Sequence, residues 1–209
     1  MQACSFFSGF LGPFPDVLWE PAFLTADEQA RLLDFCRTAI PWERRQLTFG
    51  SRKVDVPREL AWFGDVDYVY SGIRHPARPM PEPLAALARA IEAWLANEGI
   101  QYAFNSVLLN RYRSGSDSIG MHADDEPQLE ERPVIASISL GAPRTFVFEH
   151  KETRLSQQGL LTSGSLLVMK GDSQLLWRHG IPKEPGHGER INLTFRHTFA
   201  LGCSRRQAA

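Results

Sequence analysis

The spacing of apolar and polar positions predicts two helices in the first half of the chain. The first should begin at Thr25–Glu28, a capping box in which the threonine hydroxyl and the glutamate carboxylate satisfy free backbone amides, and run to about Thr38. The second is expected over Pro83–Asn97, with a proline near its start and Gly99 just past its end. Its apolar positions recur at helical spacing: Leu84, Leu87, Ile91 and Leu95.

Short segments rich in β-branched and aromatic residues predict strands elsewhere. Arg44–Phe49 and Val54–Phe63 flank Gly50–Ser51, a pair that favours a hairpin turn. Further strands are expected after the second helix at Ala103–Tyr112, Val134–Leu140, Thr145–Glu149, Ser165–Met169 and Ile191–Arg196. This order predicts an α+β fold, mostly β, in which a β-sandwich or open barrel carries helices on one face.

Length and composition favour one globular domain over residues 1–209, because 209 residues with 43% hydrophobic content can bury a substantial core. The net charge of −1 provides no global basic field, although a local basic face would be enough to bind nucleic acid. Cys4, Cys36 and Cys203 have no C-x-x-C spacing, which favours a reducing, cytoplasmic location. No apolar run is long enough to span a membrane, so no membrane partner is expected. We expect a monomer, because nothing in the sequence demands a dimer.

Candidate chemistry centres on His122, Asp124 and His179. In an extended segment His122 and Asp124 project on the same side, which suits two ligands of one ion. His179 follows Leu175–Trp177, which we expect to be a strand, and is the best candidate for the third ligand. Two imidazoles and one carboxylate suit non-haem Fe(II), with open positions for an oxidant and a cosubstrate, better than structural zinc. The remaining histidines are interpreted as ordinary core or surface residues: His75, His150, His187 and His197.

Arg190 and Arg196 are the second chemical signal. They lie six residues apart on a segment that alternates like a strand, so their side chains should point to the same side. Two guanidinium groups on one side would bind a dicarboxylate through bidentate hydrogen bonds. The alternative is a pair of solvated strand charges. A metal site next to a dicarboxylate site indicates an iron and 2-oxoglutarate oxygenase.

These motifs, taken in order along the chain, resemble the AlkB family of Fe(II)/2-oxoglutarate dioxygenases. The matching segments are Asn110-Arg111-Tyr112, Asp117–Glu126, His179 and Arg190–Arg196, and the resemblance extends over about residues 40–198. It implies a double-stranded β-helix (jelly-roll) core over about residues 100–200, with the catalytic iron held at one mouth by the two histidines and the aspartate.

The resemblance also implies a cosubstrate site. Asn110 and Tyr112 would hydrogen-bond 2-oxoglutarate from a neighbouring strand. Arg190 would pair with its distal carboxylate. Arg196 would complete the carboxylate pocket and brace the acidic residues beside the metal, with Thr194 on the same face between the two arginines.

The segment of about residues 40–75 resembles the nucleotide-recognition lid of the DNA-repair branch, and of its duplex-acting members in particular. Phe49 would then be a wedge at a hairpin tip that fills the gap left by an extruded base, or alternatively a core aromatic of the hairpin. Tyr70 would stack on the flipped base opposite His122. The other expected substrate contacts are Arg58, Tyr68, Asp125 and Glu126.

Cations also cluster in this segment: Arg44, Arg45, Arg52, Lys53 and Arg58. They would form either a phosphate-tracking surface or a solvated charged face.

The resemblance implies oxidative demethylation of N-alkylated bases, such as 1-methyladenine and 3-methylcytosine, in DNA. Fe(II), 2-oxoglutarate and O2 would be used, with formaldehyde, succinate and CO2 as products. The partner would be alkylated DNA, single- or double-stranded, or RNA. Two alternatives stay open: an oxygenase of the same fold that acts on RNA or protein, and a non-catalytic module that binds damaged nucleic acid.

Overall fold

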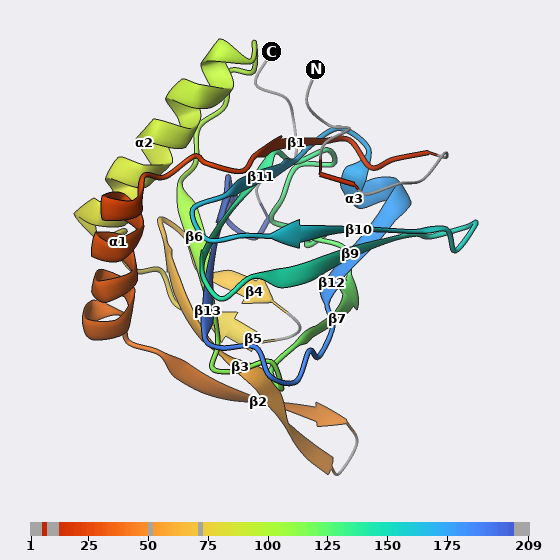
Figure 1. Cartoon of the computed structure of the whole chain (residues 1–209), viewed down its shortest axis with the longest axis horizontal. Helices are drawn as coiled ribbons and strands as arrows, with labels where there is room; N and C mark the ends of the chain where they lie inside the picture. The colour runs from red at the N-terminus through yellow and green to blue at the C-terminus, as the bar shows by residue number, and fades with distance from the viewer. Residues whose placement is uncertain (1–5, 8–12, 50–51, 71–72, 203–209) are drawn as a thin grey trace.

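The structure is a computed structural model that describes residues 6–7, 13–49, 52–70 and 73–202, with the backbone alone at 47–49, 52–53, 70 and 73 (Figure 1). The helices are α1 (Ala26–Ala39), α2 (Glu82–Asn97) and the short α3 (Ser173–Leu176). The capping box at Thr25 and Glu28 is formed, as predicted. In the described residues, no helix is long and apolar enough to cross a membrane.

Most of the described strands form two sheets. The larger sheet has the order β1 (Val17–Glu20), β11 (Leu166–Met169), β8 (Ile135–Gly141), β13 (Arg190–Arg196), β6 (Ser106–Tyr112), β3 (Arg52–Gly64) and β2 (Glu43–Phe49). The smaller sheet has the order β10 (Ser156–Leu161), β9 (Arg144–His150), β12 (Trp177–Ile181) and β7 (Ile119–His122). A separate hairpin pairs β4 (Tyr68–Tyr70) with β5 (Ile73–His75).

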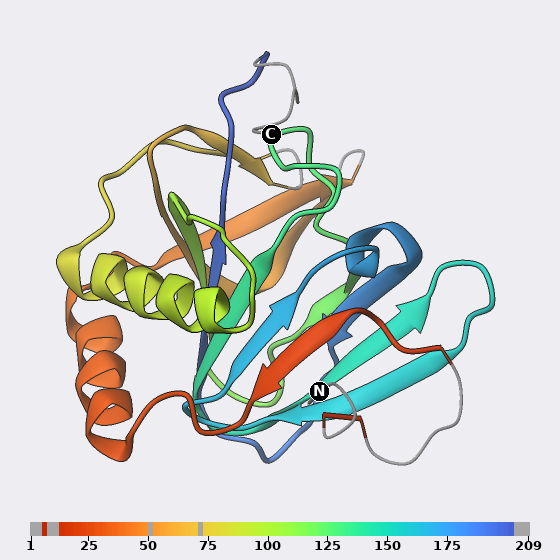
Figure 2. The ribbon, with the colours of Figure 1, turned by 90° about the horizontal axis from the view of Figure 1, so that it is seen from above.

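The two sheets pack face to face as a jelly-roll, and α1 and α2 lie together on one side of it (Figures 1 and 2). One cluster of buried residues fills the space between the sheets, with Tyr112 and Ile135 from the larger sheet and Phe148 and Trp177 from the smaller one. A second cluster packs the helices on the outer face of the larger sheet. The predicted mostly β fold with helices on one face is therefore confirmed.

Strand β13 shows how the sequence places its residues on two faces. Ile191, Leu193 and Phe195 belong to the cluster that packs against the helices. The alternate residues, from Arg190 to Arg196, line a cavity between the two sheets. Because side chains alternate along a strand, β13 contributes to the core with one face and to the candidate site with the other.

One expected strand is wrong. Leu175 and Leu176 end helix α3 and are more than one third exposed, and only Trp177 belongs to a strand. An apolar run of three residues cannot distinguish a strand from a helical turn, because it covers less than one helical period. His179 consequently lies within β12 itself and not after a strand.

Candidate active site

His122 and His179 are brought together by strand pairing. Strands β7 and β12 run antiparallel, and their register places His122 directly opposite His179. The two ring centroids are 4.4 Å apart. Nδ1 of His122 lies 2.9 Å from the carbonyl oxygen of Gly120. A carbonyl can only accept, so Nδ1 carries the hydrogen and Nε2 bears the lone pair that a metal would use.

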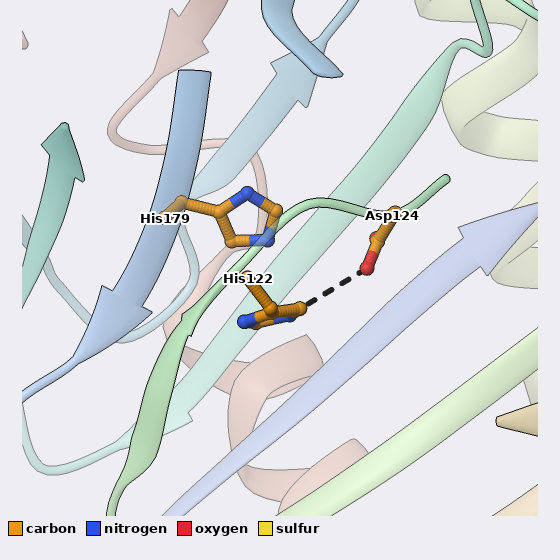
Figure 3. A group of neighbouring side chains, drawn as sticks. All are labelled: His122, Asp124 and His179. Atoms are coloured by element: carbon orange, nitrogen blue, oxygen red, sulfur yellow. Dashed lines mark ion pairs between the residues drawn. The ribbon is translucent and has the colours of Figure 1, made fainter. Parts of the chain in front are cut away.

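Asp124 completes the group from the loop that follows β7. One potential ligand atom from each of His122, Asp124 and His179 lies within 4.8 Å of the others (Figure 3). Oδ1 of Asp124 is 3.5 Å from Nε2 of His122 and is buried, with no hydrogen-bond partner among the described residues. An orphaned carboxylate oxygen beside two imidazoles fits a divalent metal.

Burial and charge set the protonation of these three groups. Burial lowers the pKa of His122, and it lowers that of His179 to about 3, so both imidazoles are neutral near pH 7. Burial alone would raise the pKa of Asp124, but the Arg196 guanidinium and the two histidines outweigh it and hold that pKa well below its usual range. Neutral imidazoles and an ionised carboxylate are the forms that ligate a metal.

The cavity beside the triad is lined from both sheets. Its polar lining residues are Asn110, Tyr112, His122, Asp124, Ser137, His179, Arg190, Asn192, Thr194 and Arg196. The structure thus brings every residue predicted for the metal and the cosubstrate to one cavity. The alternative of solvated strand charges is excluded for the two arginines, since Arg190 is 1% and Arg196 is 3% exposed.

Arg190 carries the strongest indication of a bound anion. Its Nη2 donates to Oγ of Ser139 at 2.9 Å, and its guanidinium carbon lies 5.2 Å from the ring centre of Tyr112. Nε and Nη1 are buried without a partner among the described residues. Burial lowers the pKa of Arg190 to about 10, which leaves the group charged at pH 7. A buried cation with two unused donors fits a carboxylate.

Neighbouring polar groups have defined orientations. Asn192 donates from Nδ2 to Oγ of Ser137 at 2.7 Å, and the Thr194 hydroxyl donates to Oδ1 of Asn192 at 2.8 Å. Asn110 accepts at Oδ1 from Nε of Arg58 at 2.8 Å. Because that oxygen is used, Asn110 presents its amide hydrogens as the remaining donors of its side chain. Arg58, expected to contact substrate, is buried and directed at this asparagine.

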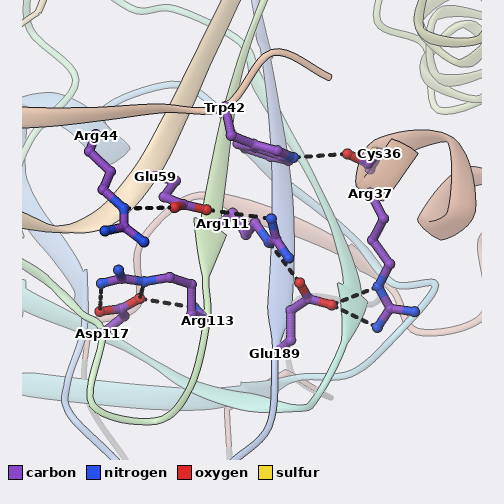
Figure 4. A network of polar contacts seen from close by, with 9 residues as sticks. All are labelled: Cys36, Arg37, Trp42, Arg44, Glu59, Arg111, Arg113, Asp117 and Glu189. Atoms are coloured by element: carbon purple, nitrogen blue, oxygen red, sulfur yellow. Dashed lines mark hydrogen bonds and ion pairs between the residues drawn. The ribbon is translucent and has the colours of Figure 1, made fainter. Parts of the chain in front are cut away.

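The three described side chains of the predicted phosphate-tracking cluster have partners within the protein, and the role of the cluster stays a prediction. Arg44 pairs with Glu59 of the adjacent strand, as Figure 4 shows, and Arg45 pairs with Glu43. With Arg58 turned inward, three of the five cations have partners inside the protein. The side chains of the other two, Arg52 and Lys53, lie outside the described residues.

The same network continues across the larger sheet. Arg111 lies between Glu59 and Glu189, and Glu189 also binds Arg37 of α1 (Figure 4). The base of the β2–β3 hairpin is therefore tied to the helix layer and to the residue that precedes Arg190. Arg44 and Arg37 have intramolecular partners, but their side chains remain half or more exposed.

The remaining expected substrate residues lie near the metal loop or outside the described part. Tyr68 is fully buried and stacks on Trp62 with ring centroids 4.4 Å apart. Burial, followed by the charge of Asp124, raises the pKa of Glu126 to about 7, and Asp125 is exposed. Phe49 is the last residue of β2 and Tyr70 the last of β4, but their side chains lie outside the described residues. Their roles stay predictions.

Sequence reasoning missed three groups that support the site. Ser137 and Ser139 on β8 hydrogen-bond Asn192 and Arg190. Their signal was visible, because two serines alternate with apolar residues in a strand otherwise suited to a core. Gln174 accepts a hydrogen bond from the backbone of Asp124, and no sequence pattern marked it.

Comparisons with known proteins agree with this geometry. A profile of the 2OG-Fe(II) oxygenase superfamily matches residues 16–196. The chain is 36% identical over 190 residues to human alpha-ketoglutarate-dependent dioxygenase alkB homolog 3. This alignment covers 86% of the chain and 65% of that protein. The chain is also 34% identical over 215 residues to Arabidopsis thaliana DNA oxidative demethylase ALKBH2. This alignment covers 89% of the chain and 67% of that protein. The chain thus spans about two thirds of the length of these relatives.

A solved structure supports the fold independently. The structure of OsALKBH1 superposes with a TM-score of 0.65 at 21% identity, over 89% of this chain and 100% of the other. That identity is informative for the fold alone. The superfamily profile and the sequence matches, together with a cavity that fits Fe(II) and 2-oxoglutarate, show that the chain belongs to the AlkB family of the 2OG-Fe(II) oxygenase superfamily.

Proposed function

We propose that this protein is an Fe(II)/2-oxoglutarate-dependent dioxygenase that demethylates N-alkylated bases, such as 1-methyladenine and 3-methylcytosine, in DNA. One observation carries the oxygenase assignment. The cluster of His122, Asp124 and His179 shares a cavity with Arg190, whose two unpartnered donors suit a carboxylate. The DNA substrate is supported by the likeness to a protein named DNA oxidative demethylase.

The residues of the cavity have separate tasks in this proposal. The triad holds Fe(II), and Arg190 binds the distal carboxylate of 2-oxoglutarate, with Asn110 and Tyr112 orienting the molecule. Fe(II), when bound, supplies the site at which O2 oxidises 2-oxoglutarate to succinate and CO2 and oxidises the N-methyl group. One oxygen atom enters succinate and the other converts N–CH3 into N–CH2OH. That product releases formaldehyde and leaves N–H on the base.

The protein holds the geometry and excludes water, since the oxidising power belongs to the metal and cosubstrate. Ser139 and the Tyr112 ring fix the Arg190 guanidinium, and the apolar wall of Phe146 and Ile181 closes the cavity on the smaller sheet. These groups are buried before any ligand arrives, so the site is preorganised.

Residues 40–75 are proposed to act as the substrate lid of one catalytic domain, with the jelly-roll core over about 100–200. Tyr68 and Glu126 would contact polar edges of the flipped base. The side chain of Glu126 interacts with Tyr68 and with the charge of Asp124, which supports a role for both residues beside the proposed metal. We propose that the protein acts as a monomer and that its partner is alkylated DNA.

A coupled assay tests this function. Purified protein with Fe(II), ascorbate and 2-oxoglutarate is given methylated single- and double-stranded DNA, and succinate and formaldehyde are measured. We expect equal amounts of both products, and none from His122→Ala or Asp124→Ala. Full activity in either variant would refute the metal assignment.

The same assay separates the alternatives. Greater turnover of methylated RNA or of a peptide panel than of DNA would reassign the substrate and keep the oxygenase. Binding of methylated DNA without any consumption of 2-oxoglutarate would favour a non-catalytic module. Against a pure binding protein stands the complete ligand set next to a buried arginine, which binding alone does not require.

A further inference from the structure

The three candidate metal ligands are held in different ways. His122 and His179 lie on paired strands, so the hydrogen bonds of the sheet fix their separation. Asp124 lies in the irregular segment 123–134 after β7, outside any strand. Its position therefore depends on side chains that bind it from other parts of the fold.

Two such side chains meet Asp124. Arg196 donates to its Oδ2 from Nη2 at 2.6 Å and from Nε at 3.2 Å. Gln174 accepts the backbone N–H of Asp124 at Oε1, at 2.9 Å. Asp124 is 1% and Gln174 is 2% exposed, so bulk water does not reach this N–H to replace the glutamine. Loss of the acceptor would leave a buried amide unsatisfied.

The orientation of the Gln174 amide is set by its surroundings. Its Nε2 donates to Sδ of Met169 and to Oγ of Ser173, both at 3.4 Å. Its backbone oxygen accepts from Nζ of Lys151 at 2.8 Å. These contacts direct Oε1 at Asp124. Because α3 leads directly into β12, one short segment carries both Gln174 and the ligand His179.

We propose that Gln174 is a positioning residue that holds the backbone of Asp124 so that Oδ1 meets the two histidines in metal-binding geometry. The proposal rests on the proposed function in one respect, that the triad binds a divalent metal. Residues that orient metal ligands in this way typically change metal affinity by about 10–100-fold when they are replaced.

The test is a Co(II) titration of the purified, metal-free full-length chain, followed by visible absorption, with the unfolding midpoint of the metal-free protein measured beside it. Q174M is nearly isosteric and lacks the amide acceptor. We expect its Kd for Co(II) to rise about 10–100-fold and its Co(II) bands to shift. The matched control L175A removes a side chain of α3 that is more than one third exposed, and it should keep the wild-type Kd and spectrum.

The outcomes are distinguishable. A wild-type Kd and spectrum in Q174M would overturn this proposal and leave the proposed function standing. Equal weakening in Q174M and L175A would do the same, since α3 packing would then be the cause. If Q174M does not fold, Q174N keeps the amide on a shorter side chain. An intermediate Kd supports the proposal and a wild-type Kd overturns it. A wild-type protein that binds no Co(II) would overturn both proposals.

Discussion

Arg196 binds only one of the two carboxylate oxygens of Asp124. Its hydrogen bonds at 2.6 and 3.2 Å both end on Oδ2, so Oδ1 is left facing Nε2 of His122. Both residues are buried, and each compensates the charge of the other. The arginine thus supplies two things that the metal site needs: an ionised aspartate, and one oxygen of that aspartate available for coordination.

We expect R196M to lower the free energy of unfolding of the metal-free protein by about 3–5 kcal/mol, because it leaves the Asp124 charge buried and unpaired. The double variant D124N/R196M removes that charge and should be more stable than R196M alone. Urea unfolding of R196M, of D124N and of the double variant measures the coupling between the two residues. Strictly additive effects would show that the pair is not coupled.

Removing the Arg190 guanidinium should act on the cosubstrate. We expect R190M to raise KM for 2-oxoglutarate by more than about 100-fold, because two charge-assisted hydrogen bonds are lost at roughly 1.5–3 kcal/mol each. S139A removes only the hydroxyl that holds the guanidinium and should raise this KM by about fivefold, or ~1 kcal/mol. Initial rates against 2-oxoglutarate measure both. R111M is the control, since Arg111 binds Glu189 and Glu59 on the other face of the sheet. An equal rise in R111M would contradict the assignment.

Gln128 should couple the β4–β5 hairpin to the loop that carries Asp124. It accepts from the backbone of Val69 at 2.8 Å and donates to the carbonyls of Asp67 and Phe199 at 2.6 and 3.1 Å. We expect Q128A to raise KM for methylated oligonucleotide at least tenfold while KM for 2-oxoglutarate stays unchanged, because the loss of these three hydrogen bonds, each worth ~1 kcal/mol, loosens the hairpin. Q46A, an exposed glutamine of the β2–β3 hairpin, is the control. A parallel rise in both KM values would indicate general unfolding.

Phe49 is predicted to act on duplex DNA. If its ring fills the gap left by the extruded base, F49A should lose roughly tenfold more activity on double-stranded than on single-stranded methylated DNA, since aromatic stacking is worth about 1–3 kcal/mol. V54A, which removes an exposed apolar side chain from the same hairpin, should reduce both activities equally or not at all. Equal losses in F49A would reject the wedge and favour a structural role.

The Arg144–Glu184 pair predicts an acid-sensitive part of the stability. Burial raises the pKa of Glu184, but hydrogen bonds from Thr145 and Arg144 outweigh burial and hold the pKa below its ordinary value of 4.5. A lowered pKa in the folded state stabilises the protein above pH 4.5, and this contribution is lost as the pH falls through the folded-state pKa. We therefore expect the difference in unfolding free energy between wild type and E184Q to be constant near neutrality. This difference should shrink as the pH falls below 4.5.

Urea unfolding at several pH values between neutrality and strong acidity measures this difference. E131Q, which changes an exposed carboxylate, is the control. A difference that does not shrink on acidification would rule out the pair as its source.

The local sequence pattern was sufficient to predict the helices, most of the strands and much of the candidate site. The capping box at Thr25 and the helical spacing of Leu84 to Leu95 depend only on near neighbours, and both helices were predicted within two residues. The alternation of β13 likewise placed Arg190 and Arg196 on one side. These features follow from the periods of helix and strand and need no knowledge of distant contacts.

Contacts that depend on the register between paired strands could not be predicted from the local pattern. Arg44 meets Glu59 because β2 and β3 pair in one particular alignment, and a shift of register lies next to that pair. A cluster of cations in the sequence therefore looked like a free surface. The same holds for Gln174, since nothing near it in the chain indicates that its amide reaches Asp124, fifty residues earlier.

The two-faced strand β13 has a mechanical consequence. Arg190 and Arg196 are six residues apart on one continuous strand, so their Cα atoms are separated by about 20 Å, the rise of six extended residues. The backbone of β13 therefore fixes the distance between Arg190, which is proposed to bind the cosubstrate, and Arg196, which binds Asp124. An insertion of one residue between them would turn one arginine into the apolar layer under the helices. Substitutions could change the chemistry of the proposed iron and cosubstrate sites, but the backbone of this shared strand sets the spacing between them.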